Sequence, residues 1–119
     1  MFGVTVDMER GLFETRIEGF WTLADVAAFG AAIAEASGRI AAIGRAPVSL
    51  CDYTGAALQS QEVINALQAI MENPVHRSRR VAMYTSGAMA RMQAVRATAS
   101  REEFRFFTDR AEAERWLMA

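Results

Sequence analysis

The chain has 119 residues, 52% of them hydrophobic and 23% charged, which predicts one globular domain over residues 1–119. Its formal net charge of −1 provides no overall field to attract nucleic acid or an anionic membrane. All thirteen basic residues are arginine, so Schiff-base chemistry and a lysine general base are excluded. The single cysteine, Cys51, excludes an intrachain disulfide and fits a reducing cytoplasm. No apolar run approaches the ~20 residues of a transmembrane helix.

The beginning of the chain predicts an antiparallel pair of strands. Phe2–Val6 alternates weakly, and a short polar loop ending in Gly11 follows it. Leu12–Gly19 then alternates, with Phe13 and Ile17 on one face and charged side chains on the other. This pattern is typical of a half-buried hairpin.

A long helix follows the hairpin. Thr22 is the expected N-cap, and Asp25 lies three residues further on, as in a capping box. We expect the helix to end near Ser37–Gly38 or to extend toward Gly44. Its apolar positions recur at helical spacing at Leu23, Val26, Phe29 and Ile33.

The middle of the chain predicts a second strand–helix unit. The short apolar run Val48–Cys51 is typical of a buried parallel strand. Ser60 is the expected cap of the next helix, and Asn73–Pro74 ends it.

The rest of the chain predicts two more strands and two more helices. The strands are Arg80–Thr85 and Phe104–Phe107, and Ser86–Gly87 leads into the helix between them. Asp109 is the expected cap of the last helix. The inward-facing residues are expected to be Met89, Met92 and Val95 in the first of these helices and Ala113, Trp116 and Leu117 in the second.

The resulting order is ββαβαβαβα, which predicts an α/β fold. Strands that alternate with helices become parallel neighbours joined by right-handed crossovers. We therefore expect a mixed, mostly parallel five-stranded sheet with four helices and the antiparallel N-terminal hairpin at one edge.

Small polar residues follow the predicted parallel strands, where open α/β sheets bind their ligands. They are Asp52, Tyr53, Thr54 and Gly55 in a turn after the Val48–Cys51 strand, then Ser86 and Gly87, then Thr108 and Asp109. These residues indicate a working face that could hold an anion or a phosphorylated hydroxyl near helix N-termini. The alternative is that all of them are turn and cap residues.

The Asp52–Gly55 segment resembles the Asp-Ser-Ser-Gly turn of STAS domains, the anti-sigma-factor antagonists. Other segments resemble a divergent bacterial branch, the SpoIIAA-like or STAS/SEC14-like proteins: Glu18–Thr22, Leu50–Asp52, Arg79–Ala82 and Ala113–Leu117. The resemblance covers nearly the whole chain.

In STAS antagonists a partner kinase phosphorylates the second hydroxyl residue of this turn, and by position that residue is Thr54. The resemblance therefore implies a switch in which phosphate blocks a protein interface by repulsion and desolvation. The chain departs from the family at Tyr53, which replaces a serine, and at Ala56–Ala57, which replaces Leu-Gly. We expect the Tyr53 ring beside Thr54 to change how a kinase or partner docks.

The SpoIIAA-like resemblance implies a second role, in binding a lipid or a small apolar ligand with peripheral membrane contact. Met83, Met89 and Met92 and the Phe104–Phe107 run could line an apolar pocket, although such residues also form ordinary cores. Arg77, Arg79 and Arg80 could hold a phosphate or a lipid headgroup, or form a solvated loop.

The residues present give little support for a catalytic function. His76 is the only histidine and lies among arginines, and Cys51 lies inside an apolar strand, where a thiol is usually inert. No cysteine–histidine spacing matches a metal site, and no glycine-rich loop matches a nucleotide-binding motif. We therefore expect no cofactor and a non-enzymatic protein.

Three functions remain open at this point. The leading one is a STAS-like module that binds a protein partner through Asp52–Gly55 and Ser86–Gly87. An open apolar cavity between the Asp52 turn and the third predicted helix would favour the lipid or apolar-ligand function instead. A purely structural subunit would form a stable homodimer.

Overall fold

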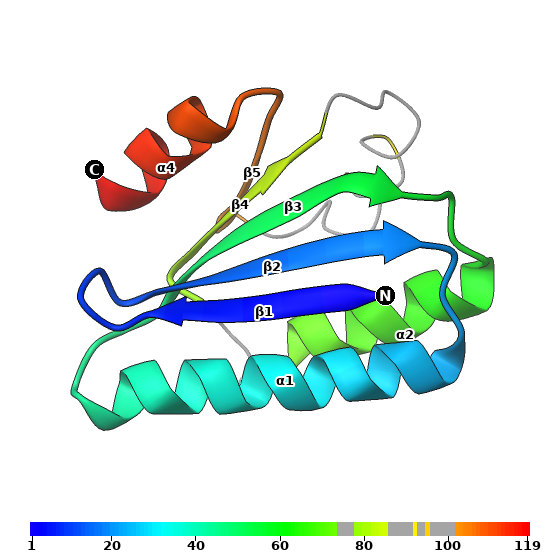
Figure 1. The fold of residues 1–119 in the computed structure, drawn as a ribbon, viewed down its shortest axis with the longest axis horizontal. Helices are drawn as coiled ribbons and strands as arrows, with labels where there is room; N and C mark the ends of the chain where they lie inside the picture. Colours follow the sequence, from blue (N-terminus) through cyan, green and yellow to red (C-terminus); the bar gives the residue numbers. More distant parts are fainter. Residues whose placement is uncertain (74–77, 86–91, 93–94, 96–101) are drawn as a thin grey trace.

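The structure is a computed structural model that describes residues 1–73, 78–85, 92, 95 and 102–119 (Figure 1). The strands are β1 (Phe2–Asp7), β2 (Leu12–Gly19), β3 (Val48–Ala56), β4 (Arg80–Tyr84) and β5 (Phe104–Phe107). The helices are α1 (Leu23–Ala42), α2 (Gln61–Glu72) and α4 (Arg110–Met118).

The five strands form one sheet in the order β1-β2-β3-β4-β5. β1 pairs antiparallel with β2 at one edge, and all other neighbours are parallel, as the sequence predicts. Helices α1 and α2 lie on one face of the sheet and α4 on the other (Figure 1). The sheet is therefore covered on both sides, and the carboxyl ends of the parallel strands β2 and β3 are at the right of Figure 1.

Three of the four predicted helices lie within the residues that the structure describes. The predicted helix after Ser86–Gly87 falls mostly outside the described residues. Two of its residues, Met92 and Val95, are described as helical and are 57% and 41% exposed. The expectation that they point inward is therefore wrong.

Local side-chain chemistry explains where α1 begins and ends. The Asp25 backbone N–H donates to Thr22 Oγ1 and the Thr22 backbone N–H donates to Asp25 Oδ2, which is the predicted capping box. The helix continues past Gly38 to Ala42, and Gly44 follows with a φ of 78°. A left-handed residue just beyond the helix is the usual glycine termination, so the longer of the two predicted ends is right.

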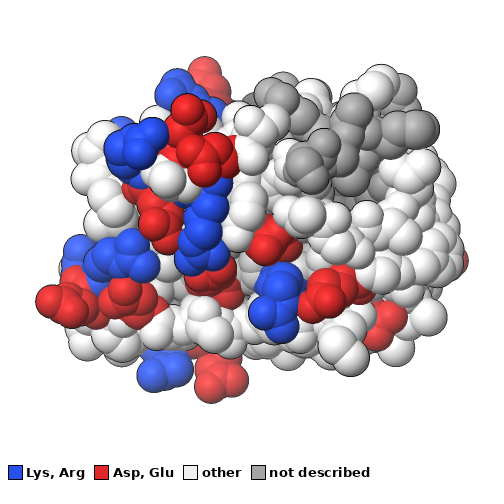
Figure 2. All heavy atoms as spheres, turned by 45° about the horizontal axis from the view of Figure 1, so that its top comes forward, with Lys and Arg blue, Asp and Glu red and all other residues white. Residues whose placement is uncertain are grey.

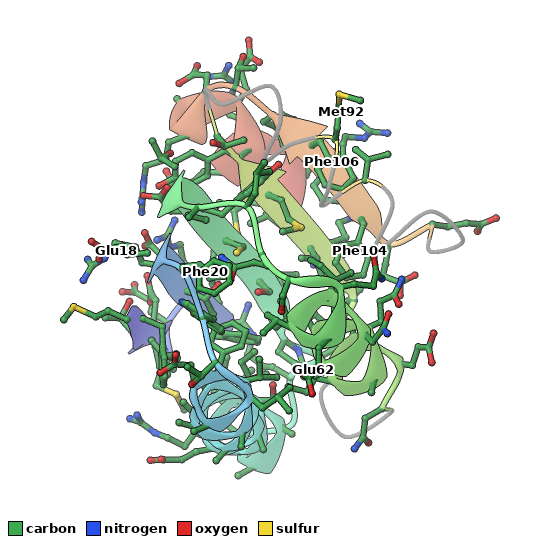
Figure 3. All side chains as sticks on the ribbon, turned by 90° about the vertical axis from the view of Figure 1, so that its right-hand side faces the viewer. Glu18, Phe20, Glu62, Met92, Phe104 and Phe106 are labelled. Carbon is green, nitrogen blue, oxygen red and sulfur yellow. The ribbon has the colours of Figure 1, made fainter. Side chains whose placement is uncertain are left out.

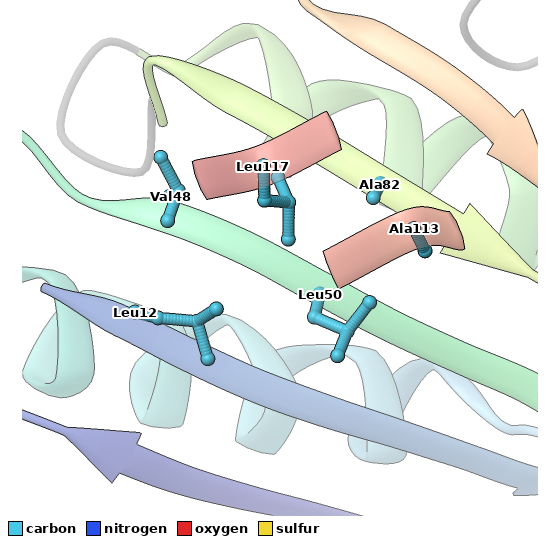
Figure 4. Close-up of a cluster of buried hydrophobic side chains, with 6 residues drawn as sticks. All are labelled: Leu12, Val48, Leu50, Ala82, Ala113 and Leu117. Carbon is cyan, nitrogen blue, oxygen red and sulfur yellow. The ribbon is translucent and has the colours of Figure 1, made fainter. Parts of the chain in front are cut away.

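The face covered by α4 is closed. Its core consists of aliphatic side chains that are at most 2% exposed, shown in Figure 4: Leu12, Val48, Leu50, Ala82, Ala113 and Leu117. Trp116 packs against this cluster and is half-buried. Strands β2, β3 and β4 and helix α4 all contribute, so this cluster holds the last helix onto the sheet.

The face covered by α1 and α2 carries two buried clusters. One contains Trp21, Val26, Phe29 and Val63, and the other contains Phe13, Ala36 and Ile40. The rings of Trp21 and Phe29 meet edge to face with their centroids 5.1 Å apart. Leu23, predicted among the inward residues of α1, is 45% exposed.

Charged side chains of both signs are interspersed around α4 and the β1–β2 hairpin on the face in Figure 2. In the other half of that view, fewer of the described residues are charged. No helix among the described residues is long and apolar enough to cross a membrane.

Candidate functional site

The Asp52–Gly55 segment is the end of a strand, not the predicted turn. β3 continues to Ala56, while its ladder with β4 ends where Asp52 pairs with Tyr84. The ladder with β2 goes on, with Gly55 opposite Glu18, after a register shift in β2. The prediction of a turn is wrong because β2, a partner distant in sequence, provides hydrogen bonds that the local residue types do not reveal.

Strand alternation sends Tyr53 and Thr54 to opposite faces. Tyr53 is 4% exposed and lies on the α1–α2 face, whereas Thr54 is exposed. The expectation that the Tyr53 ring lies beside Thr54 at the surface is therefore wrong. A Cβ on Gly55 would come within 3.2 Å of Glu18 Cγ, so a larger residue there would crowd the neighbouring strand.

Asp52 organises the surface around Thr54. Its Oδ1 accepts the Thr54 backbone N–H at 3.0 Å, and its carboxylate also interacts with the hydroxyls of Thr54 and Tyr84. Partial burial would raise the pKa of Asp52, but these hydrogen bonds and the Arg110 guanidinium outweigh it and lower the pKa below 3.8. Asp52 is therefore an ionised acceptor at neutral pH.

Arg110, in the first turn of α4, joins this carboxylate to the rest of the sheet. Its Nη1 donates to Tyr84 Oη at 3.0 Å, and its Nη1 and Nη2 donate to the two carboxylate oxygens of Glu14 on β2. Glu14 raises the pKa of Arg110, and Glu114 on the same helix accepts a further bond. Residues from β2, β3, β4 and α4 thus form one polar network on the face of the sheet that α4 covers.

Of the other predicted site residues, Arg79 and Arg80 lie away from this network. Ser86, Gly87 and Arg77 lie outside the described residues. Arg79 and Arg80 lie at the opposite end of β4, where Arg80 pairs with Val48 in the sheet register.

Arg80 has a structural environment. Its guanidinium lies 5.1 Å from the centroid of the Trp116 ring and donates to the Trp116 carbonyl oxygen. A cation near the C-terminal carbonyls of a helix stabilises the helix dipole, so Arg80 supports the end of α4.

Cys51 has the properties of an inert thiol. It is 6% exposed, and burial raises its pKa to about 12, so the nucleophilic thiolate is absent at neutral pH. Among the residues that the structure describes, no group of three or more histidine, cysteine, aspartate and glutamate side chains could hold a metal ion.

An apolar cavity of about 150 Å³ lies between the sheet and helices α1 and α2. Its wall includes Phe29, Ile33, Leu67 and Ile70 from the helices and Met83 from β4. The polar groups in the wall include the side chains of Thr15, Ser49, Tyr53 and Gln59. The predicted pocket residues Met83 and Phe104 do line a cavity, while Phe107 packs on the α4 face and Met89 lies outside the described residues.

Two loops at the carboxyl ends of β2 and β3 are fastened together by Gln59. Its Oε1 accepts the Trp21 backbone N–H at 2.8 Å, and its Nε2 donates to the carbonyls of Gly19 at 2.9 Å and Ala57 at 2.8 Å. The Ala57 backbone N–H donates to the Gly19 carbonyl at 3.2 Å. The two loops are therefore held as one unit.

This unit carries large apolar side chains at the surface. Phe20 is 64% exposed, Leu23 45% and Leu58 46%. Figure 3 looks onto this end of the molecule and shows Phe20 between Glu18 and Glu62. Because Trp21 is buried against Phe29, its neighbour Phe20 is turned outward.

The sequence patterns did not predict the Arg110 network, the Gln59 hydrogen bonds or the exposed apolar side chains of the loops. One signal was available, since Phe20 and Trp21 are adjacent at a strand-to-helix junction, where both rings cannot enter one core. Nothing local signals the other contacts, since Arg110 and Glu14 are 96 residues apart and Gln59 and Trp21 are 38 apart.

Comparison with known proteins places the fold. Neither a protein-family model nor a protein with a curated description matches the sequence. The chain is similar to the crystal structure of an anti-sigma factor antagonist from Mycobacterium paratuberculosis, with a TM-score of 0.69 and 13% identity over 100% of this chain and 96% of that one. It is also similar to an uncharacterised DUF3478-family protein with a SpoIIAA-like fold from Shewanella loihica, with a TM-score of 0.69 and 21% identity over 98% of this chain and 92% of that one.

Both likenesses cover nearly the whole chain, and their low identities speak to the fold alone. They agree with the five-stranded sheet, the edge hairpin and the resemblance drawn from the sequence. The chain therefore has a STAS/SpoIIAA-like fold.

Proposed function

We propose that the chain is a non-enzymatic, cytoplasmic regulatory module that binds a protein partner at the carboxyl ends of its parallel strands. The partner-binding surface includes Asp52, Thr54 and Gly55. One observation carries the proposal: β3 extends beyond its pairing with β4 and presents an exposed Thr54, held by the Asp52 carboxylate, at the place where α/β folds bind their ligands. The shared fold with an anti-sigma factor antagonist supports it.

Phosphate on Thr54 would switch such a surface. The added −1.5 to −2 charges (approximately, at neutral pH) would stand beside the ionised Asp52 carboxylate. The contact between the Thr54 hydroxyl and Asp52 would be replaced by repulsion, and a partner packed on this surface would meet a strongly hydrated group. Phosphorylation would therefore release the partner.

The test is to incubate the protein with ATP and a lysate of the organism that encodes it, and to map phosphorylation by mass spectrometry. Pull-downs with Thr54→Glu and with Thr5→Glu then compare this surface with an exposed threonine on the edge strand β1. We expect phosphate at Thr54 and loss of a partner from Thr54→Glu alone. If Thr54 is not phosphorylated and no partner depends on Thr54, the proposed phosphorylation switch is wrong.

The apolar cavity supports a second candidate, the binding of a small apolar ligand. A cavity of about 150 Å³ lined mostly by aliphatic and aromatic side chains has the volume to take a benzene-sized molecule. It would hold a ring or a short alkyl segment rather than a whole lipid. The structural neighbours do not favour this function over partner binding.

Native mass spectrometry of gently purified protein tests this candidate. A co-purified small molecule, together with a higher thermal midpoint in the presence of benzene or indole, would support it. An apo mass with no thermal shift would argue against ligand binding and leave the proposed partner surface unaffected.

A further inference from the structure

Phe20, Leu23 and Leu58, which we call the loop patch, are exposed on a rigid support. Phe20 is the middle residue of Gly19–Trp21, and Leu58 is the middle residue of Ala57–Gln59. The flanking residues of the two segments are joined by three hydrogen bonds of 2.8 to 3.2 Å. The two side chains therefore project from neighbouring segments that are fixed to each other.

Rigid display of large apolar side chains is a property of binding surfaces. A backbone segment that is already fixed loses little freedom on binding, and a few large side chains contribute most of the affinity of an interface. The Trp21 Nε1 donates to the Glu18 carbonyl at 3.0 Å, which fixes the base of the same loop. The backbone under the patch is therefore ordered before a partner binds.

Two acidic side chains lie near Phe20 of the loop patch. Glu18 precedes Phe20 by two residues, and Glu62 is exposed in the first turn of α2. Figure 3 shows Glu18 and Glu62 on either side of Phe20. Arg16 offsets one of these charges by pairing with Glu18 at 2.7 Å.

The negative charge near the loop patch indicates which kind of partner can bind there. An anionic membrane would be repelled by the acidic rim, since lipid surfaces recruit basic patches. A second copy of the chain meeting its own patch across a two-fold axis would bring like-charged rims together. A partner that presents an apolar side chain flanked by arginine or lysine complements both parts of the surface.

We propose that the loop patch is the docking site for a protein segment that combines a large apolar side chain with flanking basic residues. The proposal rests on the proposed partner-binding function and names the chemistry of the partner. Phe20 and Leu58 are the anchors, and Glu62 contributes to selection by charge.

A displayed peptide library selected on the intact protein tests the inference. Binding of the enriched peptides is measured by fluorescence anisotropy against wild type and Phe20→Ser/Leu58→Ser, with Ile43→Ser as the matched control. Ile43 is 53% exposed but lies just after α1, at the other end of that helix. Because the altered side chains are exposed, all variants should keep the thermal midpoint of the wild type.

We expect the enriched peptides to carry an apolar residue beside arginine or lysine. Phe20→Ser/Leu58→Ser should weaken their binding by about tenfold or more, Glu62→Gln by about two- to threefold, and Ile43→Ser by less than about twofold. The inference is overturned if no peptide is enriched, if the enriched peptides are acidic, or if the double variant binds them as well as wild type does.

Two further experiments test whether a second copy of the chain or a membrane binds the patch instead. Loss of dimers in Phe20→Ser by analytical ultracentrifugation would assign the patch to a second copy, and patch-dependent sedimentation with phosphatidylglycerol vesicles would assign it to a membrane; either result overturns the inference. Peptides that lose binding to Thr54→Glu but not to the double variant would overturn it while leaving the proposed function in place. If neither variant weakens any peptide, both fail.

Discussion

The two faces of the sheet differ in how completely their side chains fill the space beneath the helices. Under α4, aliphatic side chains with no more than 2% exposure close the core, whereas a cavity of about 150 Å³ remains under α1 and α2. β3 contributes to both, sending Leu50 and Asp52 toward α4 and Cys51 and Tyr53 toward the cavity. β3 therefore takes part in both the closed core under α4 and the wall of the cavity under α1 and α2. Thr54, near its end, is exposed.

The largest expected effect comes from matched leucine truncations on the two faces. Leu50→Ala removes a fully buried side chain and should lower the free energy of unfolding by about 3–5 kcal/mol. Leu67→Ala, at the wall of the existing cavity, should cost about 1–2 kcal/mol because fewer contacts are lost. Urea denaturation measures both, and equal losses would contradict the contrast between the faces.

Arg110→Gln tests the polar network that fastens α4 to the sheet. The side chain is 43% exposed, so its bonds to Glu14 and Tyr84 should contribute only about 1 kcal/mol. Thermal unfolding should show a lower midpoint for this variant. Arg115→Gln on the same helix is the control, and an equal shift in both would show that the network adds nothing specific.

Acid titration tests Asp52 in the same network. Because its pKa is lower in the folded protein than the ordinary 3.8, the unfolded chain takes up a proton first as the pH falls. The stability that Asp52 contributes is therefore complete well above 3.8 and is lost as the pH falls through the lower folded value. The stability difference between wild type and Asp52→Asn should be largest near neutral pH and shrink in acid; a constant difference would contradict the lowered pKa.

The smallest expected effect is a gain on the face with the cavity. A Cβ on Gly30 of α1 would lie 3.0 Å from Ile70 Cδ1, and Ile70 lines the cavity. Ile70 has room to give way, so Gly30→Ala should keep most of the helix-propensity gain, about 0.5–1 kcal/mol. A loss of stability in urea denaturation would show that this wall of the cavity is rigid.

Local patterns predict much of this fold. Thr22, Ser60 and Asp109 cap their helices as expected, and the alternation in β2 places Phe13 and Thr15 in the interior. These features depend on residues within one turn or one strand, so the sequence contains them directly.

The sequence predicted where the candidate site lies but not its backbone conformation or its long-range contacts. Asp52 and Thr54 do lie at a parallel strand end, but the segment is extended because β2 pairs with it as far as Ala56. The Arg110 network and the Gln59 bridge depend on contacts between distant segments, which no local spacing encodes. Tertiary pairing thus decided the features that residue types alone left open.

Site-specific photo-crosslinking tests the central claim, that the carboxyl-end surface is where a partner binds. Benzoylphenylalanine is placed at Thr54 or, as the control, at Thr5 on β1, and cells that express each variant are irradiated. We predict one discrete protein adduct from position 54 and none from position 5. No adduct at position 54, or the same adducts from both positions, would contradict the account.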